Sequence, residues 1–243
     1  MISAWRQAFN APSAYFGFVQ LSTWCALPPE SLPQMREAQM AALALPNVGY
    51  ATNADHGMGC SIHPSTKQYC GERLAKSALA LRYQQPVAWR SPSYKAATPA
   101  PLQVEDAQQG TASTSLVVSL NDVSAEGLYA TYPFNYASPN YGQGNPPIAV
   151  DCTASFPINA TTNSSMEQQC AWAALHVDGA GWLNASVSIQ PGGTALRLTS
   201  PLPAGSTQPA VIVGSAYGWG PIPMLNAYDR ATGLPVLPWN KSL

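Results

Sequence analysis

The sequence predicts two kinds of structure in succession: part of an α/β sheet with parallel strands, then an all-β, sandwich-like module. Residues 1–83 alternate between amphipathic stretches and short apolar runs, and this alternation predicts βα units. Beyond residue 110, β-rich runs are separated by Gly, Pro, Asn and Asp, which is typical of an all-β module. We therefore expect a domain portion over residues 1–90, a linker over 91–110 and a β module over 111–243.

Three stretches of the first part have apolar residues at helical spacing: MISAWRQAF, SLPQMREAQMAALAL and the segment after Pro64. Pro64 is suited to the first helical position. The residues expected on the buried stripes are Ile2, Trp5 and Phe9; Met35, Gln39, Met40 and Leu43; and Cys70, Leu74, Ala78 and Leu81. YFGFVQL and NVGYAT lie between these stretches and are expected as strands. The order helix–strand–helix–strand–helix predicts parallel pairing with right-handed crossovers.

Six runs of the second part are expected as strands: STSLVVSL, GLYATYPF, CAWAALHV, NASVSI, TALRLTS and AVIVGSAY. The charge pattern argues against nucleic acid as a partner, because the net charge is −1, only 9% of residues are charged and no Lys/Arg run occurs. No apolar stretch approaches the roughly 18 residues that a membrane span needs.

Four Asn-x-Ser/Thr triplets predict N-glycosylation, at Asn159, Asn163, Asn184 and Asn240. Three of them fall within 26 residues, which favours a secreted or lysosomal glycoprotein. The first residues, MISAWRQAFN, have no basic segment followed by an apolar one, so no signal peptide is recognised in this chain. We expect the chain to be the C-terminal piece of a longer precursor, whose N-terminal part is its missing partner.

Five cysteines fit an oxidising compartment with one thiol left unpaired. Cys152 and Cys170 are expected to form a disulfide across the glycosylated loop. Cys60 is expected to pair either with Cys70 or with Cys25, and both alternatives stay open. The three histidines are scattered and the cysteines follow no ligand spacing, so no metal site is expected.

His63 is the candidate catalytic residue. Ligands of open α/β sheets bind beyond the carboxyl ends of the strands. Gln20 ends the first expected strand and the loop from Asn53 to His63 follows the second, so both lie at this edge. An imidazole there is suited to take a proton from a hydroxyl group. The alternative role for His63 is to cap the helix expected to begin at Pro64, and the alternative role for Gln20 is to satisfy neighbouring backbone rather than face a substrate.

Four ordered stretches resemble the sialate O-acetylesterases, the sialic-acid-specific branch of the SGNH hydrolases. The stretch SIHPSTKQYCGERLAKSALAL is similar to the catalytic-histidine block of this family. The other three are MISAWRQAF with YFGFVQL, LPQMREAQMAALALPNVGYA, and AYGWGPIPMLNAYDRATGLPVLPW. The resemblance covers nearly the whole chain and is weakest over residues 95–165. It implies that residues 1–90 are the C-terminal part of an SGNH-type three-layer α/β/α domain.

The resemblance also implies a serine esterase that removes O-acetyl groups from sialic acids without a cofactor. His63 would be the general base and then the general acid. The Gly-Gln-Ser-Asn block that carries the family's nucleophile is absent from this sequence, so we expect the chain alone to be incomplete and inactive. The alternatives are a non-catalytic carbohydrate-binding fragment and an acetylesterase for other acetylated sugars such as xylan.

Asp55 and Arg36 complete the set of candidate site residues. Many members of the family carry an aspartate two positions before the histidine, where this chain has Ser61. Asp55 is the nearest acid and would orient His63, unless it makes an Asx-turn and a backbone carbonyl orients the imidazole. Arg36 would clamp the carboxylate of sialic acid, or would form a surface ion pair with Glu37 or Glu30.

Overall fold

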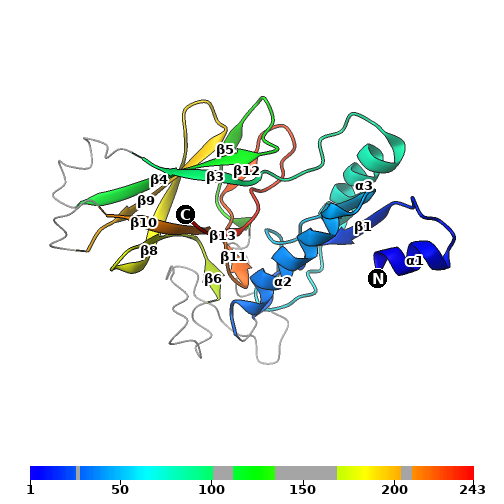
Figure 1. Cartoon of the computed structure of the whole chain (residues 1–243), viewed down its shortest axis with the longest axis horizontal. Helices are drawn as coiled ribbons and strands as arrows, with labels where there is room; N and C mark the ends of the chain where they lie inside the picture. The colour runs from blue at the N-terminus through cyan, green and yellow to red at the C-terminus, as the bar shows by residue number, and fades with distance from the viewer. Residues whose placement is uncertain (26–27, 101–111, 135–168, 204–209) are drawn as a thin grey trace.

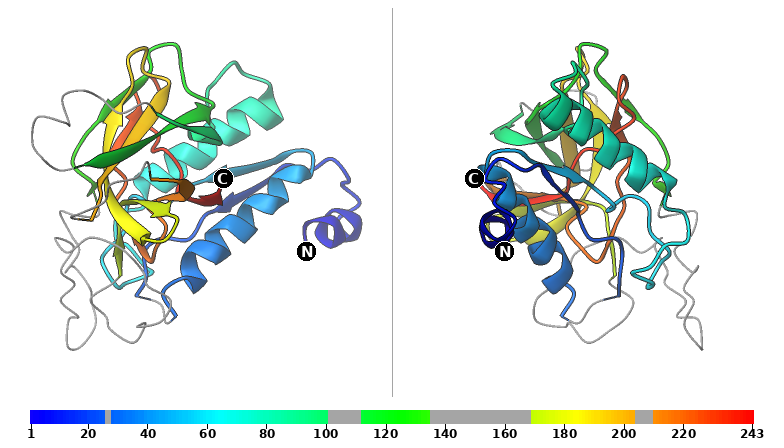
Figure 2. Two further views of the ribbon diagram at one scale, coloured as in Figure 1. Left: turned by 60° about the vertical axis from the view of Figure 1, so that its left-hand side comes forward. Right: turned by 90° about the vertical axis from the view of Figure 1, so that its right-hand side faces the viewer.

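The computed structural model describes residues 1–25, 28–100, 112–134, 169–203 and 210–243. The α-helices lie together on one side of the molecule and the strands of a large sheet lie on the other (Figure 1). The two further views show the same division (Figure 2). The helical elements are α1 (Ile2–Ala8), α2 (Ser31–Met40), the 3-10 turn η1 (Ala41–Ala44) and α3 (Gln68–Tyr83).

The helical side is built around two parallel strands, β1 (Phe16–Val19) and β2 (Val48–Ala51). They pair in register from Phe16 opposite Val48 to Val19 opposite Ala51. One face of the pair accepts α3 closely: a Cβ on Gly17 or Gly49 would meet the Tyr15 hydroxyl at 2.7 or 2.9 Å. That hydroxyl lies 2.6 Å from the Ser77 hydroxyl of α3. The helix–strand order thus produces the parallel pairing that the sequence predicts for these two strands.

The other side is one antiparallel sheet of seven strands, in the order β13-β10-β7-β8-β9-β4-β3. Its strands are β3 (Ser93–Pro99), β4 (Ser113–Asn121), β7 (Ala173–Val177), β8 (Gly181–Ile189), β9 (Ala195–Pro201), β10 (Ile212–Tyr217) and β13 (Trp239–Ser242). Two short pairs flank it: β5 (Leu128–Ala130) with β12 (Ala227–Asp229), antiparallel, and β6 (Cys170–Ala171) with β11 (Ile222–Pro223), parallel.

The large sheet curls until it is nearly closed. Tyr94 of the edge strand β3 and Trp239 of the opposite edge strand β13 have ring centroids 5.7 Å apart. Alternate residues of the strands point into one shared core, as Leu116 and Val118 of β4 and Leu196 and Leu198 of β9 do at 0% exposure. The two edge strands of the sheet thus come close to each other at this point.

The fold class expected from the sequence is therefore wrong. The chain is mostly β, and its main element is an antiparallel, nearly closed sheet instead of a three-layer α/β/α domain with parallel strands followed by a two-sheet sandwich. In the described residues, parallel pairing is confined to β1–β2 and to the short β6–β11 pair. Residues 93–99, inside the segment expected as a linker, form strand β3. The division into domains remains a prediction.

The helices bury only part of the faces that the apolar spacing predicts: Ile2 and Cys70 are buried as expected, whereas Trp5 and Phe9 are exposed. Helix α2 buries Leu32, Pro33 and Arg36, whereas Met35 is 53% exposed. Helix α3 begins at Gln68, four residues after Pro64, and buries Arg73 and Ser77 together with Cys70. Helix α1 buries Arg6, whose guanidinium donates to the carbonyls of Ala14, Pro46 and Asn47. No helix among these described elements is long and apolar enough for a membrane span.

Candidate functional site

The loop that follows β2 holds both candidate catalytic residues, Asp55 and His63. It starts with a buried polar segment, Thr52 to Asp55, at the carboxyl end of the strand. The Thr52 hydroxyl donates to Gln20 Oε1 at 2.7 Å, and the Gln20 amide nitrogen lies 3.3 Å from the Arg36 carbonyl. Gln20 and the loop therefore meet at the carboxyl edge of β1 and β2. Both the oxygen and the nitrogen of the Gln20 side-chain amide form hydrogen bonds within the protein.

Asp55 is held by a buried ion pair with Arg73. The guanidinium donates to both carboxylate oxygens, at 2.7 and 2.8 Å, and to the Thr52 carbonyl at 2.8 Å. Burial lowers the pKa of the Arg73 guanidinium, but the charge and hydrogen bonds of Asp55 outweigh it, so the pKa is raised. The bidentate geometry fixes the loop to α3.

The imidazole next to Asp55 belongs to His56, not to His63. His56 Nε2 lies 3.6 Å from Asp55 Oδ2. Its ring is stacked between Tyr69 and Phe134, with centroids at 4.0 and 4.5 Å. Burial lowers the pKa of His56, and the attraction of Asp55 only partly opposes this. His56 is thus a neutral, packed side chain near pH 7.

His63 lies farther along the same loop and is exposed. Its backbone N–H donates to Ser61 Oγ at 3.4 Å. Within the part of the chain that the structure describes, its imidazole forms no ion pair with a carboxylate, so Asp55 and His63 are not brought together. The side chain is open to solvent or to another molecule, and its role as a general base remains a prediction.

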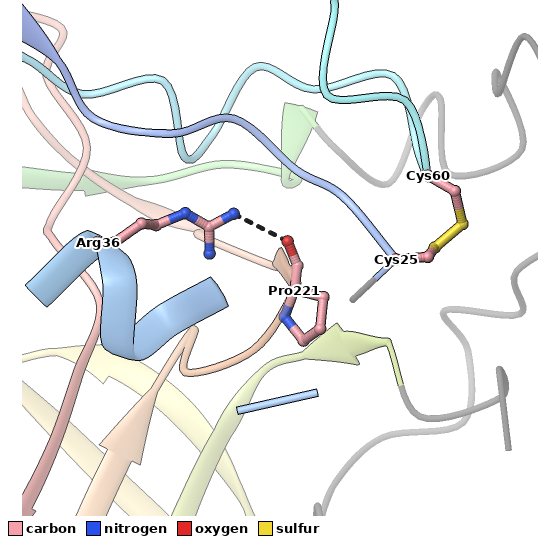
Figure 3. Close-up of a disulfide and its surroundings, with 4 residues drawn as sticks. All are labelled: Cys25, Arg36, Cys60 and Pro221. Atoms are coloured by element: carbon pink, nitrogen blue, oxygen red, sulfur yellow. Dashed lines mark hydrogen bonds between the residues drawn. A yellow bond between two sulfur atoms is a disulfide. The ribbon is translucent and has the colours of Figure 1, made fainter. Parts of the chain in front are cut away.

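A disulfide ties the His63 loop to the chain that leaves β1. It joins Cys25 to Cys60, three residues before His63 (Figure 3). This is one of the two pairings that the sequence left open, and Cys70 is the free, buried thiol. Cys170 is also disulfide-bonded, while Cys152, its predicted partner, lies outside the described residues.

Arg36 lies beside this disulfide and ties two loops together. Its guanidinium donates to the carbonyls of Leu21 and Ser22, at 2.8 and 2.7 Å, and to those of Gly220 and Pro221, at 2.8 and 2.9 Å. Figure 3 shows the bond to Pro221. Burial lowers its pKa to about 9. Arg36 is 2% exposed, so it forms neither of the surface ion pairs considered from the sequence. The Arg36 guanidinium, which was expected to bind the carboxylate of sialic acid, donates instead to four backbone carbonyls.

The remaining predicted residues lie elsewhere. Asn184 on β8 and Asn240 on β13 are exposed, as glycosylation requires, whereas Asn159 and Asn163 fall outside the described residues. The described residues contain no group of three His, Cys, Asp or Glu side chains that could hold a metal ion.

Sequence reasoning missed Arg73 and Tyr69, which set the geometry of the loop. They are four residues apart on α3, and the Arg73 guanidinium lies 5.4 Å from the Tyr69 ring centroid. The Tyr69 hydroxyl contacts Asn53 Oδ1 at 2.6 Å and the His56 carbonyl at 2.8 Å. The spacing of a tyrosine and an arginine along one helix face, just after an Asp-containing loop, was the available signal.

Comparison with known proteins relates the fold to that of a solved enzyme structure. No protein-family model and no curated protein matches the chain. Among solved structures, the fold recurs in a carbohydrate acetylesterase from Xanthomonas citri, with a TM-score of 0.64 and 22% sequence identity. The match covers 99% of this chain and 44% of that protein, so the chain spans less than half of its length. The likeness shows a shared fold.

Proposed function

We propose that this chain is the histidine-bearing portion of a carbohydrate acetylesterase, and that its substrate is an O-acetylated sialic acid. The observation that carries the proposal is an exposed His63, on a loop at the carboxyl edge of β1 and β2, in a chain whose fold recurs in a carbohydrate acetylesterase. The sequence resemblance to the sialate O-acetylesterases is independent support and supplies the sialic acid part of the proposal.

His63 would act as general base and then as general acid. It would take the proton from a serine hydroxyl that attacks the acetyl carbon, and return it to the sugar oxygen that leaves. Water then attacks the acetyl carbon of the acetyl-serine: His63 takes a proton from the water and gives it to the serine oxygen, and acetate is released. The serine is proposed to come from an N-terminal part of the same protein. Ser61 is an unsuitable nucleophile, because it lies two residues before His63 in the same tight loop and cannot easily present its hydroxyl to the imidazole.

The partner that orients the His63 imidazole is either Asp55 or a backbone carbonyl. Direct contact with Asp55 would require the exposed His63 imidazole to reach a carboxylate that is fully buried and already bound by Arg73. A carbonyl needs no such rearrangement. Asp55 then acts by holding the loop to α3, and removing its charge would disturb the position of His63 without removing a catalytic group.

Recognition of the sialic acid carboxylate needs a cation other than Arg36, whose guanidinium is bound to four carbonyls. The alternative substrate class is therefore a neutral acetylated sugar, such as acetylated xylan. The two substrates differ in one measurable respect, since only the sialate carries a negative charge next to the ester-bearing ring.

The test uses the longest natural form of the protein that contains this chain. Acetate release is measured from O-acetylsialate and from acetylated xylo-oligosaccharides, for the parent and for His63→Ala. Losing a triad base lowers kcat by about three orders of magnitude or more. His176→Ala is the matched control, because His176 lies on β7 and stacks on Trp182 of β8, with centroids 4.9 Å apart. Activity within tenfold of the parent in His63→Ala would refute the proposed role.

We also propose that the protein passes through the secretory pathway, to the lysosome or the cell exterior. A Cys25–Cys60 bond and a bonded Cys170 are suited to an oxidising compartment. Exposed Asn184 and Asn240 are accessible to glycosylation. Treatment of the native protein with an N-glycanase should increase its gel mobility, and an unchanged mobility would count against this location.

A further inference from the structure

A cavity of about 270 Å³ lies between α2 and the large sheet, and Gln20 at the end of β1 also lines it. Its lining includes one face of α2, the start of β3, the turn between β10 and β11, and β13. Sites for drug-sized ligands are about 300–1,000 Å³ and are mostly apolar with a few convergent polar groups. The volume here is just below that range, which suits a single ring with its substituents.

Trp219 is the aromatic wall of this cavity, and the protein holds it on a rigid turn. Gly218 has φ +57° and donates its N–H to the Trp172 carbonyl at 2.6 Å. The next two residues, Gly220 and Pro221, have their carbonyls bound by Arg36. Trp219 remains only partly buried although its neighbours on both sides are fixed. A partly exposed indole on a fixed turn is a preorganised stacking surface.

Two further aromatic rings continue this wall. The Trp239 ring is 2% exposed and stacks on Tyr217, with centroids 4.9 Å apart. The Tyr94 ring of β3 contacts the Trp239 ring at an angle, with centroids 5.7 Å apart. The indole N–H of Trp239 is taken by Ser215 Oγ at 3.2 Å. The hydroxyl of Tyr94 and the indole N–H of Trp219 have no hydrogen-bond partner among the described residues, so they are available to a ligand.

The charges at the rim cancel each other. Lys241 Nζ of β13 lies 2.6 Å from Glu37 Oε1 of α2, and both side chains are largely exposed. Arg36 also lines the cavity, but its guanidinium is bound to four carbonyls. The described lining thus offers hydrogen-bonding groups and aromatic faces without an unpaired cation. This chemistry fits an uncharged polyol ring and gives no special affinity for a carboxylate.

We propose that this cavity binds one neutral pyranose unit, with one face of the sugar ring against Trp219 and its hydroxyl groups towards Tyr94, Glu37 and Lys241. The aliphatic hydrogens of a pyranose face are attracted to an aromatic ring, while its equatorial hydroxyls need polar partners at the edge. The site needs neither His63 nor a nucleophile, so it stands whether or not the chain belongs to an esterase.

The test measures ligand binding with saturation-transfer NMR and with tryptophan fluorescence. The probes are methyl β-D-glucopyranoside and methyl β-D-xylopyranoside as neutral sugars, N-acetylneuraminate as the anionic sugar, and cyclohexanol as an apolar ring of similar size. We expect the neutral glycosides to bind at millimolar concentrations, and the other two probes to bind about tenfold more weakly or worse. Equal binding of cyclohexanol would overturn the proposal in favour of an apolar pocket.

Variants locate the binding. Trp219→Ala should weaken the glycosides by about tenfold or more, and Trp219→Phe should retain part of the affinity. Trp5→Ala is the matched control, because Trp5 is a 51% exposed tryptophan on α1. His63→Ala should bind like the parent, which separates this site from the proposed esterase chemistry. Unchanged binding in a folded Trp219→Ala, or no binding of either glycoside to the parent, would refute the proposal.

Discussion

Arg36 offers the sharpest test of how the structure is held together. In Arg36→Met the side chain keeps its length and most of its packing but loses the guanidinium. The carbonyls of Leu21, Ser22, Gly220 and Pro221 then lose their donor at once. These carbonyls come from two loops that are about 200 residues apart in the sequence but adjacent in space (Figure 3). The change therefore removes a direct link between the two sides of the molecule.

The expected loss follows from these four bonds. Leaving a buried acceptor unsatisfied costs about 1–3 kcal/mol, and we take the lower end for each because water can reach part of an opened loop. The gross loss is then about 4 kcal/mol. Burial of the Arg36 charge is itself unfavourable, and it lowers the pKa of the guanidinium to about 9. Removing the charge therefore offsets part of the lost stability. We expect a net destabilisation of about 3 kcal/mol, a large share of the 5–15 kcal/mol typical of a domain.

The assay is urea unfolding followed by circular dichroism, with Arg82→Met as the control for losing an exposed arginine in the last turn of α3. The control should change the free energy of unfolding by less than about 0.5 kcal/mol. If Arg36→Met is as stable as the control but loses affinity for sialate, the guanidinium serves a ligand, and our description of it as a link between loops is wrong.

Three further predictions concern the loop and the Trp219 turn. Reducing the Cys25–Cys60 bond, or replacing Cys25 with Ser, should lower the free energy of unfolding by about 3–4 kcal/mol, because the bond closes a loop of 35 residues in the unfolded chain. Denaturant titrations with and without a reductant measure this loss, and equal unfolding midpoints would contradict the prediction. Burial lowers the pKa of His56 in the folded state, so the unfolded chain binds a proton more readily as the pH falls below about 6.5. The free energy of unfolding should therefore decrease below this pH and be unaffected by His56 above it. Thermal unfolding at several pH values checks this, and His56→Phe should make the melting temperature depend less on pH. Gly218→Ala should cost about 1–3 kcal/mol, since a Cβ at φ +57° would collide with Leu225; a melting temperature equal to that of the parent would refute it.

Local patterns in the sequence predicted the elements well because they depend on neighbouring residues. The helical stretch around Trp5 and the apolar run around Phe18 appear as α1 and β1, and the parallel pairing of β1 with β2 follows from their order. The six predicted β-rich runs all contain strands. What failed was the assembly of these elements into a fold.

Strand pairing is a long-range property that periodicity does not encode. Alternation along β4 places Leu116 and Val118 on a core-facing side, whether that side faces a second sheet or the inside of a curled one. The pairing of seven strands in one sheet and the approach of Tyr94 to Trp239, more than 140 residues apart, distinguish the two cases. The sandwich prediction was therefore wrong although its strands were right.

The candidate site was predictable only where it depends on neighbouring residues in the sequence. The exposure of His63 on a loop after β2 follows from local sequence. The partner of Asp55 does not, because Arg73 reaches it only after α3 packs on β2. Apolar spacing also predicts no burial for Arg6, Arg36 or Arg73, which this weakly charged chain uses to satisfy backbone carbonyls and one carboxylate.

The most direct test of the central proposal is chemical rescue of His63. In the longest natural form of the protein, His63→Gly should lose acetate release from O-acetylsialate by about three orders of magnitude. Because the imidazole is exposed, added imidazole can enter the vacated space. The account predicts that activity rises with imidazole concentration, most strongly above the pKa of free imidazole, where the neutral base is present. Full activity in His63→Gly, or a loss of activity that imidazole does not restore at any pH, would contradict the role of His63 as the general base.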